Sequence, residues 1–112
     1  MKIEMKNLRE LIVKNNYKKQ LKEVSKYPDY NEELLKKYVQ MLRNNEKLPE
    51  KAKDHKLSKH SPGIYSGCRD FHLAPDIVVV YRLTSDALEL VAIGKHNKLQ
   101  LTSSWNYFGY YS

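Results

Sequence analysis

The sequence predicts an α+β fold in which two helices pack on one face of an antiparallel sheet. Two amphipathic segments with helical spacing fill the first half of the chain. The second half holds two apolar runs, 77–81 and 88–93, with a polar turn at 84–87 between them. With 112 residues the chain can bury one modest core but not two. We therefore expect a single domain over residues 1–112, with an N-terminal strand, two helices and a three-strand C-terminal meander.

The first two predicted elements are a short strand and a basic helix. Residues 8–13 (Leu-Arg-Glu-Leu-Ile-Val) are long enough only for an edge strand. Tyr17, Leu21 and Val24 follow at helical spacing, and lysines occupy the rest of that helix surface. Pro28 cannot continue a helix, so this segment is expected to end before it.

The second predicted helix has the clearer pattern. Asp29 and Glu32 have the spacing of a capping box, which would satisfy backbone N–H groups at the helix start. A single apolar stripe follows, formed by Leu34, Leu35, Tyr38, Met41 and Leu42. The Asn44-Asn45 pair ends the helix, and a polar, lysine-rich linker over residues 50–62 leads to the strands.

The three C-terminal strands are expected over residues 64–73, 77–81 and 88–93. Alternation along the first of them separates polar chemistry from core: one face carries Cys68, Asp70 and His72, and the other carries Arg69, Phe71 and Leu73. We expect the helices to cover the second set and to leave the first face available. Cys68 is expected to be a packed small residue.

The last hairpin predicts which polar side chains meet. If Leu83 faces Leu88 across the turn, the register places Asp76 opposite Lys95. His96 then lies beside Asp76 at the edge of the sheet.

Four side chains can gather at that edge. The strand before the hairpin brings His72 to it, and His55 lies in the linker that precedes that strand. With His96 and Asp76 they outline a proton-transfer site. Two alternatives remain: His72 and Asp76 could simply stabilise their turn, or the histidines could bind zinc, although none has a typical metal-binding spacing.

Composition narrows the classes of partner. The formal charge of +7 should attract polyanions such as nucleic acid, or an acidic protein. The single cysteine cannot form an internal disulfide, and the first residues lack the apolar core of a signal peptide. No apolar stretch reaches the length of a membrane span. We therefore expect a cytoplasmic protein that does not enter the membrane.

Three motifs resemble those of the YafQ branch of the RelE/ParE toxins, which are ribosome-dependent mRNA endonucleases of bacterial toxin–antitoxin pairs. Residues 53–57 match Lys-Asp-His-x-Leu, residues 67–76 match Gly-x-Arg-Asp-x-His-x-x-Pro-Asp, and residues 94–96 match Gly-x-His. The middle motif is specific, whereas the flanking two are weak alone. The resemblance runs from about residue 8 to 99, with a small insertion at 59–62. It implies a RelE/ParE-like fold and leaves a leader, 1–7, and an aromatic tail, 100–112, outside it.

The resemblance implies that His55, His72, Asp76 and His96 are the catalytic residues. RNA cleavage by its own 2′-hydroxyl needs a base, an acid and a cationic environment for the phosphate. Histidine, with a usual pKa of about 6.5, suits both proton-transfer roles. Because Asp76 should favour the imidazolium form of His96, His96 is the expected acid and His72 or His55 the base. His60 has no predicted role.

Three positions depart from the family pattern. The family places an arginine where this chain has Ala92, a tryptophan or another apolar residue where it has Ile77, and an aromatic residue where it has Gln100. The arginine would hold the scissile phosphate. We therefore expect the substrate-binding cation to be Lys95, Lys98 or Arg82, with weaker activity because lysine lacks a bidentate fork, and we expect Ala92→Arg to raise cleavage.

The resemblance also implies partners: an acidic antitoxin similar to DinJ, and the ribosome, which presents mRNA in its decoding site. It implies no cofactor. The alternatives are a non-catalytic ParE-like toxin that binds and poisons a protein target such as DNA gyrase, or a weakened toxin that retains mainly antitoxin binding. Converging histidines favour the nuclease, because binding alone does not require them.

Overall fold

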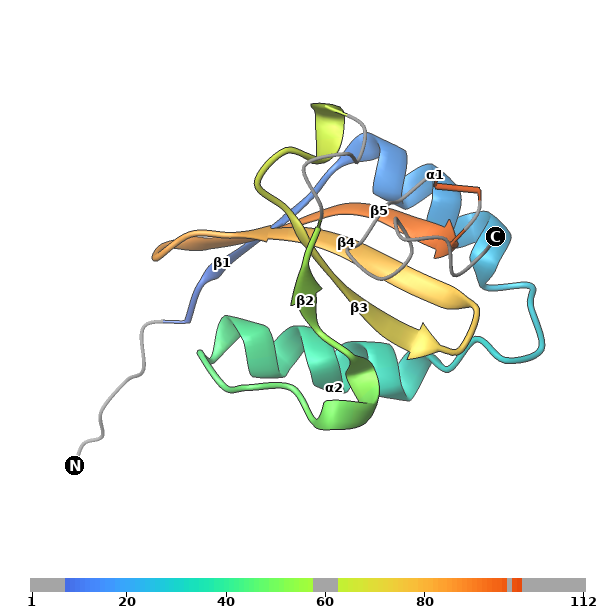
Figure 1. Cartoon of the computed structure of the whole chain (residues 1–112), viewed down its shortest axis with the longest axis horizontal. Helices are drawn as coiled ribbons and strands as arrows, with labels where there is room; N and C mark the ends of the chain where they lie inside the picture. Colours follow the sequence, from blue (N-terminus) through green and yellow to red (C-terminus); the bar gives the residue numbers. More distant parts are fainter. Residues whose placement is uncertain (1–7, 58–62, 97, 100–112) are drawn as a thin grey trace.

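The computed structural model describes residues 8–57, 63–96 and 98–99 (Figure 1). Strand β1 (Glu10–Val13) leads into helix α1 (Asn15–Val24), and helix α2 (Glu32–Arg43) follows. The remaining elements are two short 3-10 helices and four strands: η1 (Glu50–Ala52), β2 (His55–Lys56), η2 (Gly63–Tyr65), β3 (Arg69–Ala74), β4 (Ile77–Leu83) and β5 (Ala87–Lys95). Within these described ranges, no helix has the length and apolarity needed to cross a bilayer.

The five described strands form one mixed sheet in the order β1-β5-β4-β3-β2. The neighbours from β2 to β5 are antiparallel, which confirms the C-terminal meander. Strand β1 instead pairs in parallel with β5, so the expectation of a fully antiparallel sheet is wrong at this edge. The two helices between β1 and the meander give the chain the length that a parallel crossover requires. The α+β architecture itself is confirmed.

Strands β2 and β3 differ most from the prediction. Strand β2 lies inside the segment expected to be a linker and pairs His55 with Asp70. A two-residue strand is too short to show any periodicity. Strand β3 begins at Arg69 rather than at Ile64, because residues 63–65 form a 3-10 turn and Gly67 has a φ of 77°, in the left-handed region that favours glycine.

The cap of α2 also differs from the prediction. The Asn31 side chain, not a capping box begun by Asp29, accepts a hydrogen bond of 3.0 Å from the backbone N–H of Leu34. Asparagine is as effective at this position as aspartate. Glu32 and Glu33 in the first turn complement the positive end of the helix dipole.

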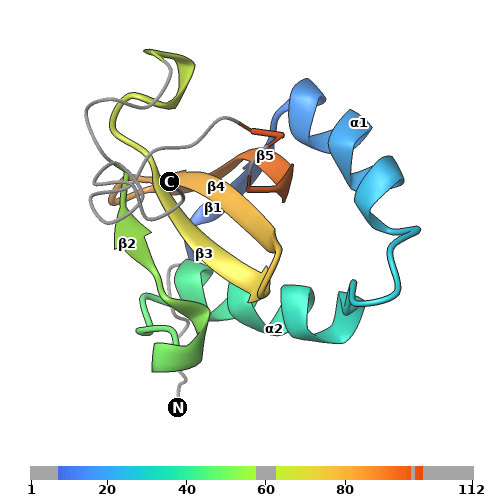
Figure 2. The same cartoon turned by 45° about the vertical axis from the view of Figure 1, so that its right-hand side comes forward.

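Both helices contribute to one core on a single face of the sheet. Figure 2 shows α1 alongside β5 and α2 running below the sheet. From the helices this core buries Tyr17, Val24, Leu35, Tyr38 and Leu42, and from the strands it buries Phe71, Leu73, Ile77, Val79, Tyr81, Leu88, Leu90 and Ile93. The edge-to-face contact of Tyr38 with Phe71, with ring centroids 5.4 Å apart, joins α2 to β3.

The opposite face of the sheet is not entirely free. It carries a smaller buried cluster formed by Tyr65, Cys68, Val78, Val80, Val91, Ala92 and Leu99. The prediction that Cys68 is a packed residue is therefore confirmed, and the expectation that the whole face stays available is wrong. Residues around η2 and after β5, including Tyr65 and Leu99, cover this part of the face.

A β-bulge in β5 changes the predicted hairpin register. Leu83 faces Leu88 as expected, but the pairing shifts after Tyr81↔Leu90, so that Val80 faces Ala92 and Val91 is the extra residue. Ile77, not Asp76, therefore lies opposite Lys95. Because side chains alternate, one extra residue moves every later side chain of β5 to the other face.

Arg9 connects three parts of the fold. Its Nε donates to the carbonyl of Thr84 at 2.7 Å, and its Nη1 donates to the carbonyl of Leu42 at 2.9 Å. Arg43 returns a bond from its own Nε to the Arg9 carbonyl at 2.8 Å. The start of β1, the β4–β5 turn and the carboxyl end of α2 are thus held by one guanidinium, which also faces the negative end of the helix dipole.

We expect Arg9→Ala to lower the free energy of unfolding by about 2 kcal/mol, because hydrogen bonds from a charged donor are lost and two carbonyls lose a partner. Urea denaturation followed by circular dichroism measures this. Lys18→Ala, at an exposed α1 position, is the control and should change stability by less than about 0.5 kcal/mol. Equal effects of the two substitutions would contradict the connecting role of Arg9.

Candidate functional site

The structure brings the predicted histidines to one end of the sheet. His55 lies on β2, His72 on β3, and His96 directly after β5. The ring centroids of His72 and His96 are 6.1 Å apart. The bulge at Val91 explains this proximity, because it places residues after it on the opposite face from the one that a regular β5 would give.

Asp76 lies in the turn between β3 and β4, at the same end of the sheet. Its carboxylate is 3.2 Å from the ammonium of Lys95, so these two side chains meet even though their backbone positions are not paired. The Asp76 side chain is 54% exposed. The four predicted catalytic residues therefore lie together, with Asp76 at the solvent side.

Burial lowers the pKa of both His72 and His96 below the usual 6.5. For His72 the second cause is the charge of His96, and for His96 it is the charge of His55. The charge of Asp76 raises the pKa of His96, but its effect is smaller than those of burial and of the His55 charge. The expectation that Asp76 makes His96 the readily protonated ring is therefore wrong. The net pKa shift of His96 is downward, because desolvation of the imidazolium outweighs its attraction to the carboxylate.

Asp70 is a part of this site to which the sequence assigned no role. It is fully buried, with 0% of its surface exposed, and pairs with His55 across β2 and β3. Its carboxylate oxygen Oδ1 lies 3.3 Å from Nδ1 of His55. Neither carboxylate oxygen has a hydrogen-bond partner among the described residues. The sequence signal that could have identified Asp70 as a site residue was its position on the same face of the predicted strand as His72.

Burial raises the pKa of Asp70 to about 6, against the lowering effect of the nearby His55 charge. A carboxyl group with a raised pKa then lies beside an imidazole ring. Such a pair can hold one proton between its members near neutral pH. The arrangement can therefore both store and release a proton.

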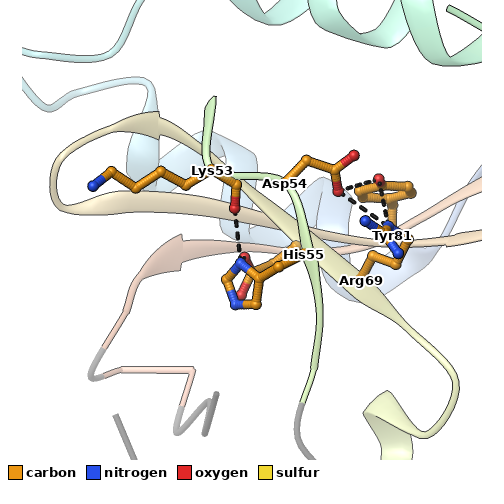
Figure 3. A network of polar contacts seen from close by, with 6 residues as sticks. Lys53, Asp54, His55, Arg69 and Tyr81 are labelled. Atoms are coloured by element: carbon orange, nitrogen blue, oxygen red, sulfur yellow. Dashed lines mark hydrogen bonds and ion pairs between the residues drawn. The ribbon is translucent and has the colours of Figure 1, made fainter. Parts of the chain in front are cut away.

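His55 is oriented by the backbone next to it. Its Nδ1 lies 2.7 Å from the carbonyl oxygen of Lys53, a contact drawn in Figure 3. Lys53 has a φ of 51°, an uncommon left-handed conformation for a residue with a side chain. If Nδ1 donates to this carbonyl, Nε2, which is buried and has no hydrogen-bond partner among the described residues, is the nitrogen left to exchange a proton.

A polar network on the other side of β2 fixes this segment. The Asp54 carboxylate accepts hydrogen bonds from the Tyr81 hydroxyl at 2.5 Å and from the Arg69 guanidinium at 3.1 Å (Figure 3). Tyr81 is fully buried in the helix-side core. Because Asp54 stands between Lys53 and His55, the core holds the backbone that orients His55.

The predicted substrate-binding cations are not equivalent. The Lys95 ammonium contacts Asp76 and lies 4.8 Å from the centroid of the Tyr27 ring, and Lys98 is exposed in the turn after β5. Arg82 donates to the Glu89 carboxylate at 2.9 Å and to the Ser66 carbonyl at 3.1 Å. It lies four residues along β4 from the position facing His72, about 13 Å away at strand spacing. Lys95 and Lys98 thus belong to the histidine end, and Arg82 to the hairpin end.

Ala92 stands where a phosphate-binding arginine was expected from the resemblance. Its exposed surface is 0%, and it belongs to the buried cluster with Cys68 and Val80. An arginine at this position would have to displace part of that cluster. The expectation that Ala92→Arg raises cleavage is therefore not supported, because overpacking a filled core costs stability.

Some residues singled out from the sequence fall outside the part of the chain that the structure describes. They are His60, Gln100 and the aromatic tail from Leu101 onward. Among residues 8–57, 63–96 and 98–99, no group of three histidine, cysteine, aspartate or glutamate side chains is placed to hold a metal ion.

Comparison with known proteins places the chain in a family. Residues 9–101 match the family model described as the bacterial toxin of type II toxin–antitoxin systems, YafQ. Among characterised proteins, the mRNA interferase toxin YafQ of Escherichia coli (strain K12) is 34% identical over 93 residues, which cover 81% of this chain and 95% of that protein.

Solved structures agree with the sequence match. The toxin–antitoxin complex DinJ–YafQ of E. coli matches with a TM-score of 0.69 and 31% identity, over 82% of this chain and 97% of the solved one. A copper-bound mutant toxin from Helicobacter pylori matches with a TM-score of 0.70 and 26% identity, over 82% and 99% of the two chains.

We expect the buried carboxylate of Asp70 to lower stability as the pH rises. Its folded-state pKa of about 6 lies above the usual 3.8, so the folded protein binds the proton more tightly than the unfolded chain. Stability attributable to this group is present below about pH 4 and is lost as the pH rises to about 6. Asp70→Asn should therefore raise the free energy of unfolding at pH 8, by up to roughly 3 kcal/mol, and should change it little at pH 4.

Denaturation of both proteins at several pH values measures this difference. Asp29→Asn, at an exposed loop position, is the matched control and should have little effect at any pH. A loss of stability in Asp70→Asn at pH 8 would indicate that the ion pair with His55 outweighs the cost of burial.

Proposed function

Because this chain belongs to the YafQ family of bacterial toxins from type II toxin–antitoxin systems, we propose that it is an endoribonuclease that cleaves mRNA on the ribosome. The observation that carries the proposal is the convergence of His55, His72 and His96 beside Asp70 at one end of the sheet. A protein that acts only by binding has no need for titratable rings at this density. The relative from E. coli is named an mRNA interferase, which agrees with this chemistry.

The proposed reaction uses the RNA's own 2′-hydroxyl. A base removes the 2′ proton, the 2′ oxygen forms a bond to phosphorus, and the bond from phosphorus to the 5′ oxygen breaks. An acid protonates that departing oxygen. The products are a 2′,3′-cyclic phosphate and a free 5′-hydroxyl, so atoms and charge balance without water or a cofactor.

The electrostatics favour a division of roles. The lowered pKa values of His72 and His96 keep these rings neutral near pH 7, as a general base requires. The Asp70 carboxyl, whose pKa burial raises to about 6, lies 3.3 Å from the His55 ring and can carry the proton that an acid needs. We therefore assign His72 or His96 as the base and the His55–Asp70 pair as the acid, in place of the sequence-based choice of His96 as acid.

Lys95 and Lys98 are the proposed cations for the scissile phosphate. Asp76 orients the Lys95 ammonium at 3.2 Å, which keeps this charge at the histidine end of the sheet. Arg82, at the hairpin end, would contact RNA only away from the cleaved bond.

A cognate acidic antitoxin is the proposed protein partner. E. coli YafQ has been solved in a complex with DinJ, and this chain carries a formal charge of +7. An acidic protein would complement that charge and compete with RNA for it.

Induction of this chain without its antitoxin should arrest growth, with mRNA cut on ribosomes. His72→Ala and His96→Ala should each slow cleavage by at least about a hundredfold, because positioned proton transfer contributes about 10²–10⁴-fold. Mapping of 5′ ends on a reporter transcript, together with single-turnover assays on programmed ribosomes, measures both effects.

His60→Ala is the matched control, because His60 belongs to no family motif, and it should leave toxicity unchanged. Circular dichroism confirms that each variant is folded. Intact mRNA together with relaxed or damaged DNA would instead support a toxin that poisons a topoisomerase.

Of the two lysines at the histidine end, Lys95 should matter more for cleavage than Lys98. Lys95→Ala removes an ammonium held in place by Asp76 and Tyr27, whereas Lys98 is exposed. We expect a loss of about tenfold to a hundredfold for Lys95→Ala and at most a few-fold for Lys98→Ala, measured as single-turnover rates. Equal cleavage rates for Lys95→Ala and the parent would mean that a group other than Lys95 binds the scissile phosphate.

A further inference from the structure

A pocket of about 540 Å³ lies on the α2 side of the histidine cluster. Its described lining combines an apolar wall with cations: Leu34, Tyr38, Leu73, Ala74, Pro75, Lys51, Lys53 and His72. The volume falls in the range of small-ligand pockets. The proposed proton transfers do not use any of its apolar residues.

The pocket and the catalytic cluster share His72. This ring lines the pocket and also lies 6.1 Å, between centroids, from the ring of His96. A ligand in the pocket would therefore adjoin any group held between His72 and His96. A polymer that places its reacting phosphate at the histidines would have its neighbouring unit within reach of the pocket.

The charge of the pocket is unbalanced. Both Lys51 and Lys53 are exposed, and neither forms an ion pair with a described residue. None of the described lining residues is acidic. Two cations at the rim of an apolar hollow match a ligand that has a flat apolar part and a phosphate attached to it.

We propose that this pocket binds one nucleotide of the RNA substrate, the one next to the cleaved bond, with its base against Leu34 and Pro75 and its phosphate between Lys51 and Lys53. The inference rests on the proposed endoribonuclease function and extends it to substrate positioning. Binding of the flanking nucleotide would hold the scissile phosphate in line with the 2′ oxygen, which is where a large part of the acceleration in such reactions arises.

A nucleotide fits these observations better than an antitoxin segment. An antitoxin peptide does not need to contact the catalytic His72 ring. The RNA chain must pass next to this ring when its phosphate is cleaved. Lysine recognises phosphate as a point charge, so two lysines suffice without side chains that read a base. The pocket would therefore bind a nucleotide with any base that fits its apolar lining, and would bind an abasic nucleotide more weakly.

The test combines a change in the protein with a change in the RNA. The protein variant is Lys51→Ala with Lys53→Gly, since glycine tolerates the left-handed φ of residue 53 and keeps the carbonyl that contacts His55. The RNA series carries a single abasic nucleotide at each position around the cleavage site. Single-turnover cleavage on programmed ribosomes is measured at pH 7, where the lowered pKa of His72 keeps this ring neutral with or without the nearby Lys53 charge.

For the parent protein, one flanking abasic position should slow cleavage by about tenfold to a hundredfold, as expected for the loss of one bound base. The double variant should cleave intact mRNA more slowly by a similar factor, and the abasic position should then have little further effect. Lys37→Ala with Lys47→Ala removes the same charge from two exposed lysines outside the pocket. This control should behave as the parent does.

Three results would overturn the proposal. If the parent cleaves intact mRNA but no flanking abasic position matters, the pocket does not bind a base, although the endoribonuclease function stands. If the double variant cleaves normally but binds its antitoxin more weakly, the pocket belongs to the antitoxin interface. If the parent cleaves no ribosome-bound mRNA, the proposed function fails, and this inference fails with it.

Discussion

The bulge at Val91 is the constraint on which the site depends. Before it, β5 directs Leu88 and Leu90 into the helix-side core. A regular strand would then direct residue 92 to the helices and residue 96 with it. The extra residue reverses this alternation, so that Ile93 returns to the core and His96 comes close to His72. A single irregularity in hydrogen-bonding register therefore decides whether two of the three histidines can act together.

Burial of charge is the second feature that organises this end of the sheet. Asp70 is a fully buried acid, and desolvation shifts its pKa in the opposite direction from those of His72 and His96. These shifts bring acid and bases toward comparable proton affinity, which is what proton transfer near neutral pH requires. The same shifts oppose folding wherever the unfolded chain would carry the charge, which is above about pH 4 for Asp70 and below about pH 6.5 for the two histidines. The site is thus maintained by the packing around it rather than by its own interactions.

The helix-side core and the site are connected through one polar network. Tyr81 packs beside Phe71 in the core and donates its hydroxyl proton to Asp54. Asp54 lies between Lys53, whose carbonyl contacts His55, and His55 itself. The core thus holds β2 in place through the Tyr81–Asp54 hydrogen bond, since a strand of two residues could not keep its position alone. The pocket that contains Lys51 and Lys53 begins on the same segment, so catalysis and the proposed nucleotide binding share one support.

The sequence by itself determined the α+β class, both helices, the C-terminal meander and the histidine set, because these follow from periodicity and from motif spacing over many residues. It could not reveal that β1 is parallel to β5, that His55 lies on a strand, or that a bulge shifts the register after Leu90. Each of these depends on contacts between segments distant in the chain. The role of Asp70 and the burial of Ala92 were likewise decided only by tertiary structure, since desolvation is a property of the surroundings of a side chain and not of its neighbours in sequence.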